Sequence, residues 1–107
     1  MESRLLSEAE IEDALVKQKG WVYDPENKCL KKAFVFKDFV CTFGVISQIA
    51  IWAEKLNHHP DWSNVYNRLE VRLSTHDLGG VGSLDLELLK RVEECVNFQC
   101  NLEAYSI

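Results

Sequence analysis

Residues 54–66 read EKLNHHPDWSNVY, and they contain the point at which a long helix must give way to a strand. Asn57 can adopt the left-handed backbone conformation that closes a helix. Pro60 cannot continue a helix, and its ring pushes His59 toward an extended backbone. The sequence therefore predicts a helix that ends inside this stretch and a strand over 62–66.

The helix before this boundary is predicted to begin after Asp38, because aspartate is a good N-cap. Apolar side chains recur along it at helical spacing. We expect this face to form the central part of the hydrophobic core, with the following residues pointing inward: Phe39, Phe43, Ile46, Ile49, Ala50, Ala53 and Leu56.

Three shorter elements are predicted upstream of that helix. Residues 7–10 read SEAE, a capping-box pattern, and predict a first helix that ends at Gly20. Turn-forming residues at 24–27 separate two β-favouring runs, 21–23 and 29–36. These two runs are expected to pair as a hairpin.

Downstream of the quoted stretch, residues 69–74 alternate apolar and polar side chains, the period of a strand with one wet face. A glycine-rich loop at 78–82 leads into a last helix over 83–100 with an apolar stripe. The order is α-β-β-α-β-β-α, and helices packed on one face of an antiparallel sheet would bury all these stripes. We expect a single α+β domain over residues 1–107.

Composition argues against nucleic-acid-binding, secreted and membrane-spanning proteins. The chain is 47% hydrophobic and 27% charged with a formal net charge of −5, which argues against a nucleic-acid-binding surface. The N-terminus is too charged for a secretory signal, and no apolar run reaches the roughly 18 residues of a membrane span.

No C-x-x-C spacing occurs, so buried thiols in a reducing compartment are predicted for Cys29, Cys41, Cys95 and Cys100. We expect a cytoplasmic protein, with the nucleus as a second location.

The three histidines are the strongest candidates for chemistry. His58 and His59 are adjacent at the predicted helix end, and His76 follows the second long strand. Glu54 lies four residues before His58 on one helix, so its carboxylate can orient that imidazole as a general base. The same residues also fit a structural role or a metal site. A histidine at a helix C-terminus opposes the helix dipole, and three histidines with one carboxylate are adequate zinc ligands, although no H-E-x-x-H or H-x-H pattern occurs.

Other polar residues carry weaker signals. Ser74 and Thr75 precede His76, and their backbone groups and hydroxyls could bind a flat polar heterocycle. Asp85 lies in the first turn of the last helix, where the helix dipole alone accounts for a carboxylate. The glycine-rich loop at 78–82 lacks the Lys and Ser/Thr of a P-loop.

The motifs combine over nearly the whole chain. Residues 54–60 read E-x-x-x-H-H-P and an aromatic residue follows, residues 74–77 read STHD, and an aspartate stands at position 85. Residues 20–21 read GW and residues 34–39 read F-x-F-K-D-F. This combination closely resembles the pterin-4a-carbinolamine dehydratase family.

The resemblance implies a four-stranded antiparallel sheet with helices on one face. It also implies an activity, that of a 4a-hydroxytetrahydrobiopterin dehydratase, a hydro-lyase. This reaction removes water from a 4a-hydroxytetrahydropterin, gives the quinonoid dihydropterin and recycles the cofactor of aromatic amino-acid hydroxylation. No metal and no organic cofactor take part in the family. The residues concerned contact the pterin ring, so the sequence does not distinguish between pterin side chains.

Site residues follow from the same resemblance. The implied catalytic residues are His58, His59, His76 and Glu54. The implied pterin-binding residues are Asn57, His58, His59, Ser74, Thr75, His76, Asp77 and Trp21. We hypothesise that His58, oriented by Glu54, and His76 form the acid–base pair while His59 binds the ring, since an imidazole with a pKa of about 6.5 can give or take a proton at neutral pH.

A second function comes from the same family. Its animal members also act as dimerisation partners of a homeobox transcription factor, so the alternative to an enzyme is a binding module, whose partner binding would survive substitution of the histidines. We expect a homodimer or homotetramer with a small-molecule pterin substrate, a possible transcription-factor partner, and no direct nucleic-acid or membrane contact.

Overall fold

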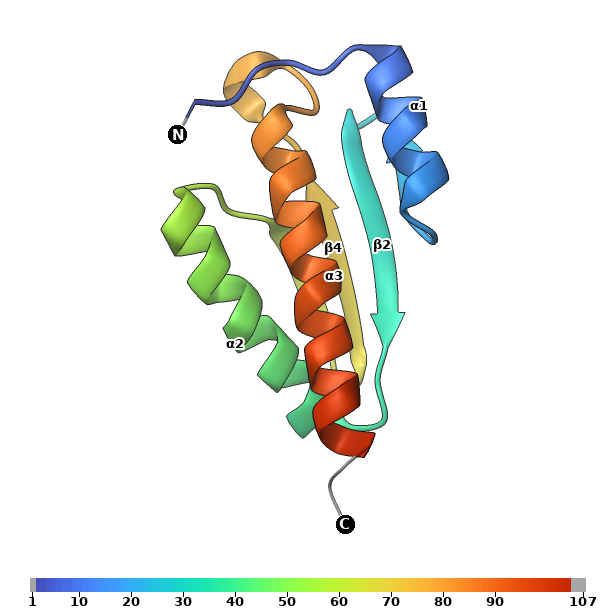
Figure 1. The fold of residues 1–107 in the computed structure, drawn as a ribbon, viewed down its shortest axis with the longest axis vertical. Helices are drawn as coiled ribbons and strands as arrows, with labels where there is room; N and C mark the ends of the chain where they lie inside the picture. Colours follow the sequence, from blue (N-terminus) through green and yellow to red (C-terminus); the bar gives the residue numbers. More distant parts are fainter. Residues whose placement is uncertain (1, 105–107) are drawn as a thin grey trace.

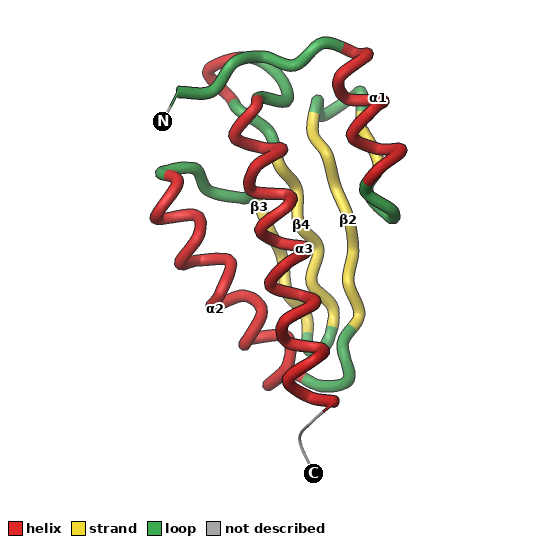
Figure 2. The backbone as a smooth tube through the Cα atoms, in the orientation of Figure 1, coloured by secondary structure: helices red, strands yellow, loops and turns green. Residues whose placement is uncertain are grey.

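The computed structural model describes residues 2–104, and the side chains of residues 2–100. Three helices lie on one face of a four-stranded antiparallel sheet with strand order β1-β2-β4-β3 (Figures 1 and 2). The predicted α+β class and element order are confirmed. The elements are α1 (Glu8–Lys17), β1 (Val22–Asp24), β2 (Cys29–Val35), α2 (Phe39–Leu56), β3 (Asp61–Val65), β4 (Arg68–Leu73), a short 3-10 helix η1 (His76–Leu78) and α3 (Ser83–Ala104).

Both predicted ends of α2 are confirmed. The Asp38 side chain accepts a hydrogen bond from the backbone N–H of Cys41 at 2.8 Å. Asn57 closes the helix in the left-handed conformation, with φ of 51°. The next residue, His58, donates its backbone N–H to the carbonyl of Ala53 at 3.0 Å. The cap therefore fixes where the chain leaves the helix and in which direction His58 departs.

The capping box of α1 is also present, with Ser7 and Glu10 each accepting from the backbone of the other. The helix ends at Lys17, earlier than the predicted end at Gly20. Gly20 has φ of 88°, and it lies in the turn that connects α1 to β1. A left-handed glycine marks this turn, while the helix itself has already ended with Gln18 in extended conformation.

The inward face of α2 agrees with the prediction only in part, at Ile49, Ala53 and Leu56. Its buried residues are Cys41, Thr42, Val45, Ile49, Ala53 and Leu56. Phe39, Phe43 and Ala50, which were expected in the core, are exposed. Apolar residues occur all round this helix, so their spacing does not single out one face. Packing against α3 and the common core decides which face is buried.

The same apolar character gives α2 the length and mean hydropathy, 1.3, of a membrane-spanning helix, a property that the sequence prediction missed. In the fold, α2 packs against α3 and its buried stripe belongs to the common hydrophobic core. Helices of this kind also occur at the centre of globular domains.

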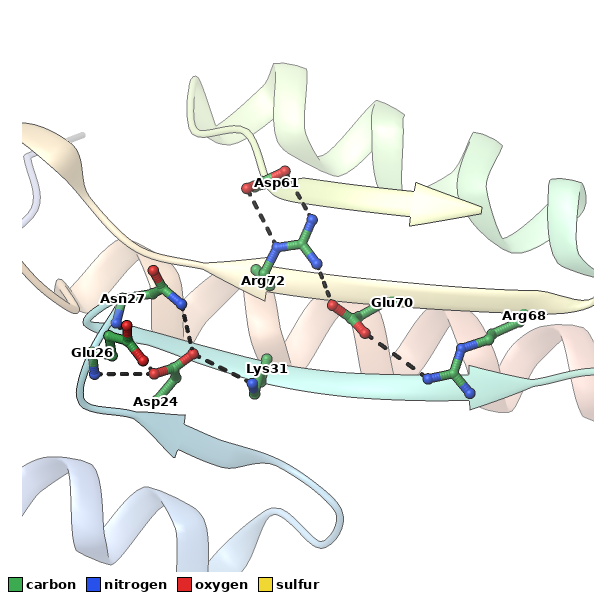
Figure 3. Close-up of polar contacts among 8 residues, drawn as sticks. All are labelled: Asp24, Glu26, Asn27, Lys31, Asp61, Arg68, Glu70 and Arg72. Carbon is green, nitrogen blue, oxygen red and sulfur yellow. Dashed lines mark hydrogen bonds and ion pairs between the residues drawn. The ribbon is translucent and has the colours of Figure 1, made fainter. Parts of the chain in front are cut away.

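The opposite face of the sheet carries a row of charged side chains (Figure 3), with exposed valines such as Val35 and Val65 beside them. The guanidinium group of Arg72 bridges Asp61, at 3.2 Å, and Glu70. Near the β1–β2 turn, Asp24 accepts from the side chain of Lys31 at 3.3 Å. The predicted wet face of β4 is therefore confirmed, and no helix of residues 2–104 covers it (Figure 1).

The cysteines follow the prediction with one exception. Cys29, Cys41 and Cys95 are buried, whereas Cys100 is exposed. Burial raises the pKa of the Cys95 thiol to about 11, which keeps it in the unreactive thiol form. Cys100 lies five residues further along α3, near the end of that helix.

Candidate functional site

The end of α2 and the start of α3 are joined by a histidine–aspartate pair. The Nε2 atom of His58 lies 2.5 Å from the Oδ1 atom of Asp85. Asp85 is the third residue of α3, and its side chain is 0% exposed, while that of His58 is 13% exposed. The His58 ring is thus anchored on a carboxylate that water does not reach.

The second oxygen of Asp85 is held by two further groups. Oδ2 accepts from the hydroxyl of Thr75 at 2.7 Å and from the backbone N–H of Gly82 at 2.7 Å. Gly82 immediately precedes α3, and a bond from this position to the third helical residue is half of a capping box. The Asp85 carboxylate therefore connects three segments, namely the end of α2, the loop after β4 and the start of α3.

His59 pairs with a different carboxylate. Its Nε2 atom lies 2.7 Å from Oε1 of Glu54, and the two side chains are 57% and 79% exposed. The predicted partnership of Glu54 with His58 is therefore wrong. The left-handed cap at Asn57 takes His58 out of the helical spacing, so the ring of His58 points toward α3 and Glu54 meets the next residue instead.

His76 lies at the start of η1, in a loop closed by paired backbone groups of Thr75 and Gly80. The His76 side chain is exposed. This loop and the β1–β2 turn together enclose a hollow of about 240 Å³, lined by Asn27, Lys28, Ser74, Thr75, His76, Gly79 and Gly80. Thr75 is common to both features, because it lines the hollow and also donates to Asp85.

The three histidines lie at one end of the sheet. Asp61, which begins β3, pairs with Arg72 near the end of β4, so the segments that carry His59 and His76 both leave the sheet here. Among the side chains that the structure describes, no hydrogen bond or ion pair joins His76 directly to either of the other two rings. The connection runs through side chains, from His58 to Asp85 and on to Thr75, the neighbour of His76.

Of the remaining predicted binding residues, two lie beside the histidines and one lies elsewhere in the fold. Asn57 and Asp77 are exposed beside the histidines, at the helix cap and in η1. Trp21 lies elsewhere, 4% exposed, with its ring edge-to-face against Phe34 and its indole N–H donated to Glu93 at 3.3 Å. A ring enclosed in this way presents no face for stacking, so the predicted pterin contact of Trp21 finds no support in its position.

Sequence reasoning missed the importance of Asp85 and of the β1–β2 turn. The only local signal for Asp85 is its place three residues after the helix N-cap, which the helix dipole already explains. Its burial and its bond to His58 depend on how α2 packs beside α3. Beside the hollow, hydrogen bonds from the side chain and backbone of Asn27, and then Lys31, lower the pKa of the Asp24 carboxyl to about 2.

A zinc site was left open by the sequence. In the part of the chain that the structure describes, no three side chains of the types His, Cys, Asp and Glu are grouped so that they could hold a metal ion. The expectation of a reaction without metal or organic cofactor stays a prediction.

Comparison with known proteins places this chain in a family. The family model described as pterin 4 alpha carbinolamine dehydratase matches residues 4–95. The chain belongs to this family. The resemblance inferred from the motifs is thereby confirmed.

Individual proteins of this family are similar to the chain over most of its length. The chain is 37% identical over 93 residues to a protein of Prochlorococcus marinus, covering 87% of this chain and 96% of the relative. It is 43% identical over 94 residues to a protein of Rhizobium johnstonii, covering 88% and 93%. Both relatives carry the provisional name pterin-4-alpha-carbinolamine dehydratase.

A solved structure extends the likeness to three dimensions. A crystal structure from Brucella melitensis, described as a transcriptional coactivator/pterin dehydratase, matches with a TM-score of 0.83 at 39% sequence identity. The match covers 87% of this chain and 99% of that chain.

Proposed function

We propose that the chain dehydrates a 4a-hydroxytetrahydropterin to the quinonoid dihydropterin by histidine acid–base catalysis. Membership of the dehydratase family supports the reaction class. The single observation that supports the mechanism is the His58–Asp85 pair, because a buried carboxylate that holds a partly exposed imidazole is an arrangement typical of a general base.

The reaction needs two proton transfers. One proton is delivered to the 4a-hydroxyl, so that the C–O bond breaks and water leaves, and another is removed from a ring nitrogen. His58 and His76 lie on segments that leave the same end of the sheet, and an imidazole can give or take a proton near neutral pH. Positioned acid–base groups contribute roughly 10²–10⁴-fold to a rate.

His59 and Asn57 are proposed to bind the pterin ring together with Ser74, Thr75 and Asp77. His59 is exposed next to His58, and Ser74 and Thr75 line the hollow beside His76. These groups offer hydroxyl, amide and imidazole hydrogen bonds to a flat heterocycle. The natural substrate is proposed to be the tetrahydrobiopterin derivative, in a cytoplasmic recycling reaction.

The test is a stopped-flow assay that follows the loss of 4a-carbinolamine absorbance. His58→Ala and His76→Ala should each lower kcat by roughly 10²-fold or more. Asp13→Asn, which changes an exposed carboxylate of α1 paired with Lys17, is the control and should keep the wild-type rate. A chelator should have no effect. Wild-type rates in both histidine variants would refute the mechanism, and loss of activity with chelator would indicate a metal.

A second candidate function is supported by a different surface. The side of α2 that faces away from the core exposes four large apolar residues, Phe39, Val40, Phe43 and Ile51. Apolar patches of this kind usually mark protein contacts. We propose that α2 of a second copy covers this side in a homodimer or homotetramer, and that a helix of a transcription factor competes for it, in keeping with the description of the Brucella structure as a coactivator.

Sedimentation velocity distinguishes this binding role from catalysis. Phe43→Glu places a charge in the middle of the apolar side of α2 and should shift the protein toward the monomer. His58→Ala lies outside that surface and should leave the assembly unchanged while it lowers the rate. An unaltered sedimentation coefficient for Phe43→Glu would show that α2 is not the contact.

A further inference from the structure

The geometry points to Asp85 as a positioning residue that fixes the tautomer of His58, so that Nδ1 of His58 is the atom that exchanges a proton with the substrate. The kinetic part of this inference rests on the proposed dehydratase function. The tautomer is a property of the folded chain and can be measured without any substrate.

The first step concerns the hydrogen between His58 and Asp85. Nε2 and Oδ1 are 2.5 Å apart, so one hydrogen lies between them. An imidazole nitrogen is more basic than a carboxylate oxygen, and an ionised carboxylate only accepts hydrogen bonds. The hydrogen therefore belongs to Nε2, and the neutral ring has its lone pair on Nδ1.

The second step concerns the other side of the ring. Nδ1 of His58 makes no hydrogen bond to a described side chain, those of residues 2–100, and 13% of the His58 side chain remains exposed. Nothing in the described fold competes for this atom. In a histidine, the partner of one ring nitrogen sets the protonation of the other, so Asp85 leaves Nδ1 as the proton acceptor.

The third step explains why Asp85 can fix the tautomer of its histidine while Glu54 cannot. Asp85 is 0% exposed, and Thr75 and the Gly82 N–H hold its other oxygen, so the carboxylate cannot turn away from His58. The Glu54–His59 pair is open to water, which competes for both partners. The described residues include two histidine–carboxylate pairs of similar length, and only the buried one is predicted to control a tautomer.

Asp85→Asn tests the mechanism because the amide cannot accept hydrogen bonds from all three of the groups that the carboxylate accepts from. The backbone N–H of Gly82 can only donate, so the new amide at position 85 must turn its oxygen toward Gly82 and Thr75. The amide NH₂ then faces Nε2 of His58, and Nε2 has to accept. The ring hydrogen must move to Nδ1, where it blocks the atom that takes the substrate's proton.

The experiment is ¹⁵N NMR of histidine-labelled protein, in which the two tautomers give different nitrogen shifts and couplings. In the wild type, His58 should carry its hydrogen on Nε2, and in Asp85→Asn on Nδ1. The signals of His59 and His76 should not change. The same variant should lower kcat by roughly 10²–10⁴-fold, the range for a misoriented general base.

Glu54→Gln is the matched control, because it makes the same acid-to-amide change in the exposed pair and should leave the tautomer of His58 as it is. Wild-type His58 with its hydrogen on Nδ1, or an Asp85→Asn protein that keeps the hydrogen on Nε2, would overturn the inference. If Asp85→Asn does not fold, the spectra of the wild type and of Thr75→Val decide; Thr75→Val retains the carboxylate, so His58 should keep its hydrogen on Nε2 in both proteins. A wild type with this tautomer and no dehydratase activity would refute the proposed function and not the assignment of Asp85.

Discussion

Oε1 of Glu54 lies 2.7 Å from Nε2 of His59, five residues later, in a pair that is exposed to water on both sides. Exposed pairs of this type contribute about 0–1 kcal/mol, because water solvates both partners. Glu54→Gln is therefore expected to lower kcat/KM by no more than about fivefold. Steady-state kinetics measures this. A loss as large as that of His58→Ala would show that Glu54 acts on the substrate directly.

Glu93 is predicted to be important for stability. Both of its carboxylate oxygens lie near Nζ of Lys32, at 3.1 and 3.2 Å, and one accepts from the indole N–H of Trp21. The Lys32 and Glu93 side chains are largely buried between β2 and α3. Glu93→Ala leaves two donors with fewer partners, and a loss of about 1–3 kcal/mol in the free energy of unfolding is expected.

Urea denaturation measures this loss, with Asp13→Ala as control. Asp13 pairs with Lys17 on the exposed side of α1, so its removal should change the free energy of unfolding by about 0.5 kcal/mol or less. Equal effects in the two variants would contradict a special role for the Lys32–Glu93 contact.

Substitutions at Asn57 can distinguish a structural role of this residue from a role in binding pterin. Its backbone is left-handed, a conformation that glycine adopts without strain and alanine does not. Asn57→Gly should keep or slightly raise the free energy of unfolding, whereas Asn57→Ala should lower it by about 1 kcal/mol. If the side chain binds pterin, both variants should raise KM. A stable Asn57→Gly protein with unchanged KM would leave Asn57 as a helix cap only.

The ion pair at the start of α1 predicts a pH dependence. Hydrogen bonds from Arg4, and then from the backbone of Ser7, lower the pKa of Glu10 to about 2. Because the folded-state pKa is below the unfolded value of about 4.3, the stabilisation is complete above about pH 5 and is lost as the pH falls toward 2.

Urea midpoints of the wild type and Glu10→Gln at pH 7 and pH 2.5 test this. The difference between the two proteins should be largest at pH 7 and clearly smaller at pH 2.5, where most of the stabilisation has been lost. Glu12→Gln removes an exposed carboxylate that has no ion-pair partner among the described side chains of residues 2–100, and it should give small differences at both pH values. A difference that grows at low pH would contradict the assignment.

Much of the fold could be predicted from local signals. Asp38, Asn57 and the capping box at Ser7 act through hydrogen bonds or backbone conformations within a few residues, so the sequence shows them directly. Alternation in 69–74 similarly identified the polar face of the sheet, which Figure 3 shows. The buried face of α2 was predicted only in part, because apolar residues occur on every side of this helix and their spacing does not reveal which side meets the core.

The sequence by itself determined the element order, the end of α2 at Asn57 and the histidines that carry the family motif. Only the tertiary structure decided which carboxylate meets which ring. A left-handed cap changes the direction of the chain in one residue, so His58 turns to Asp85, twenty-seven positions away, and Glu54 is left to His59. Spacing along a helix predicts neighbours only while the helix continues, and beyond its end the packing of α2 beside α3 sets the contacts.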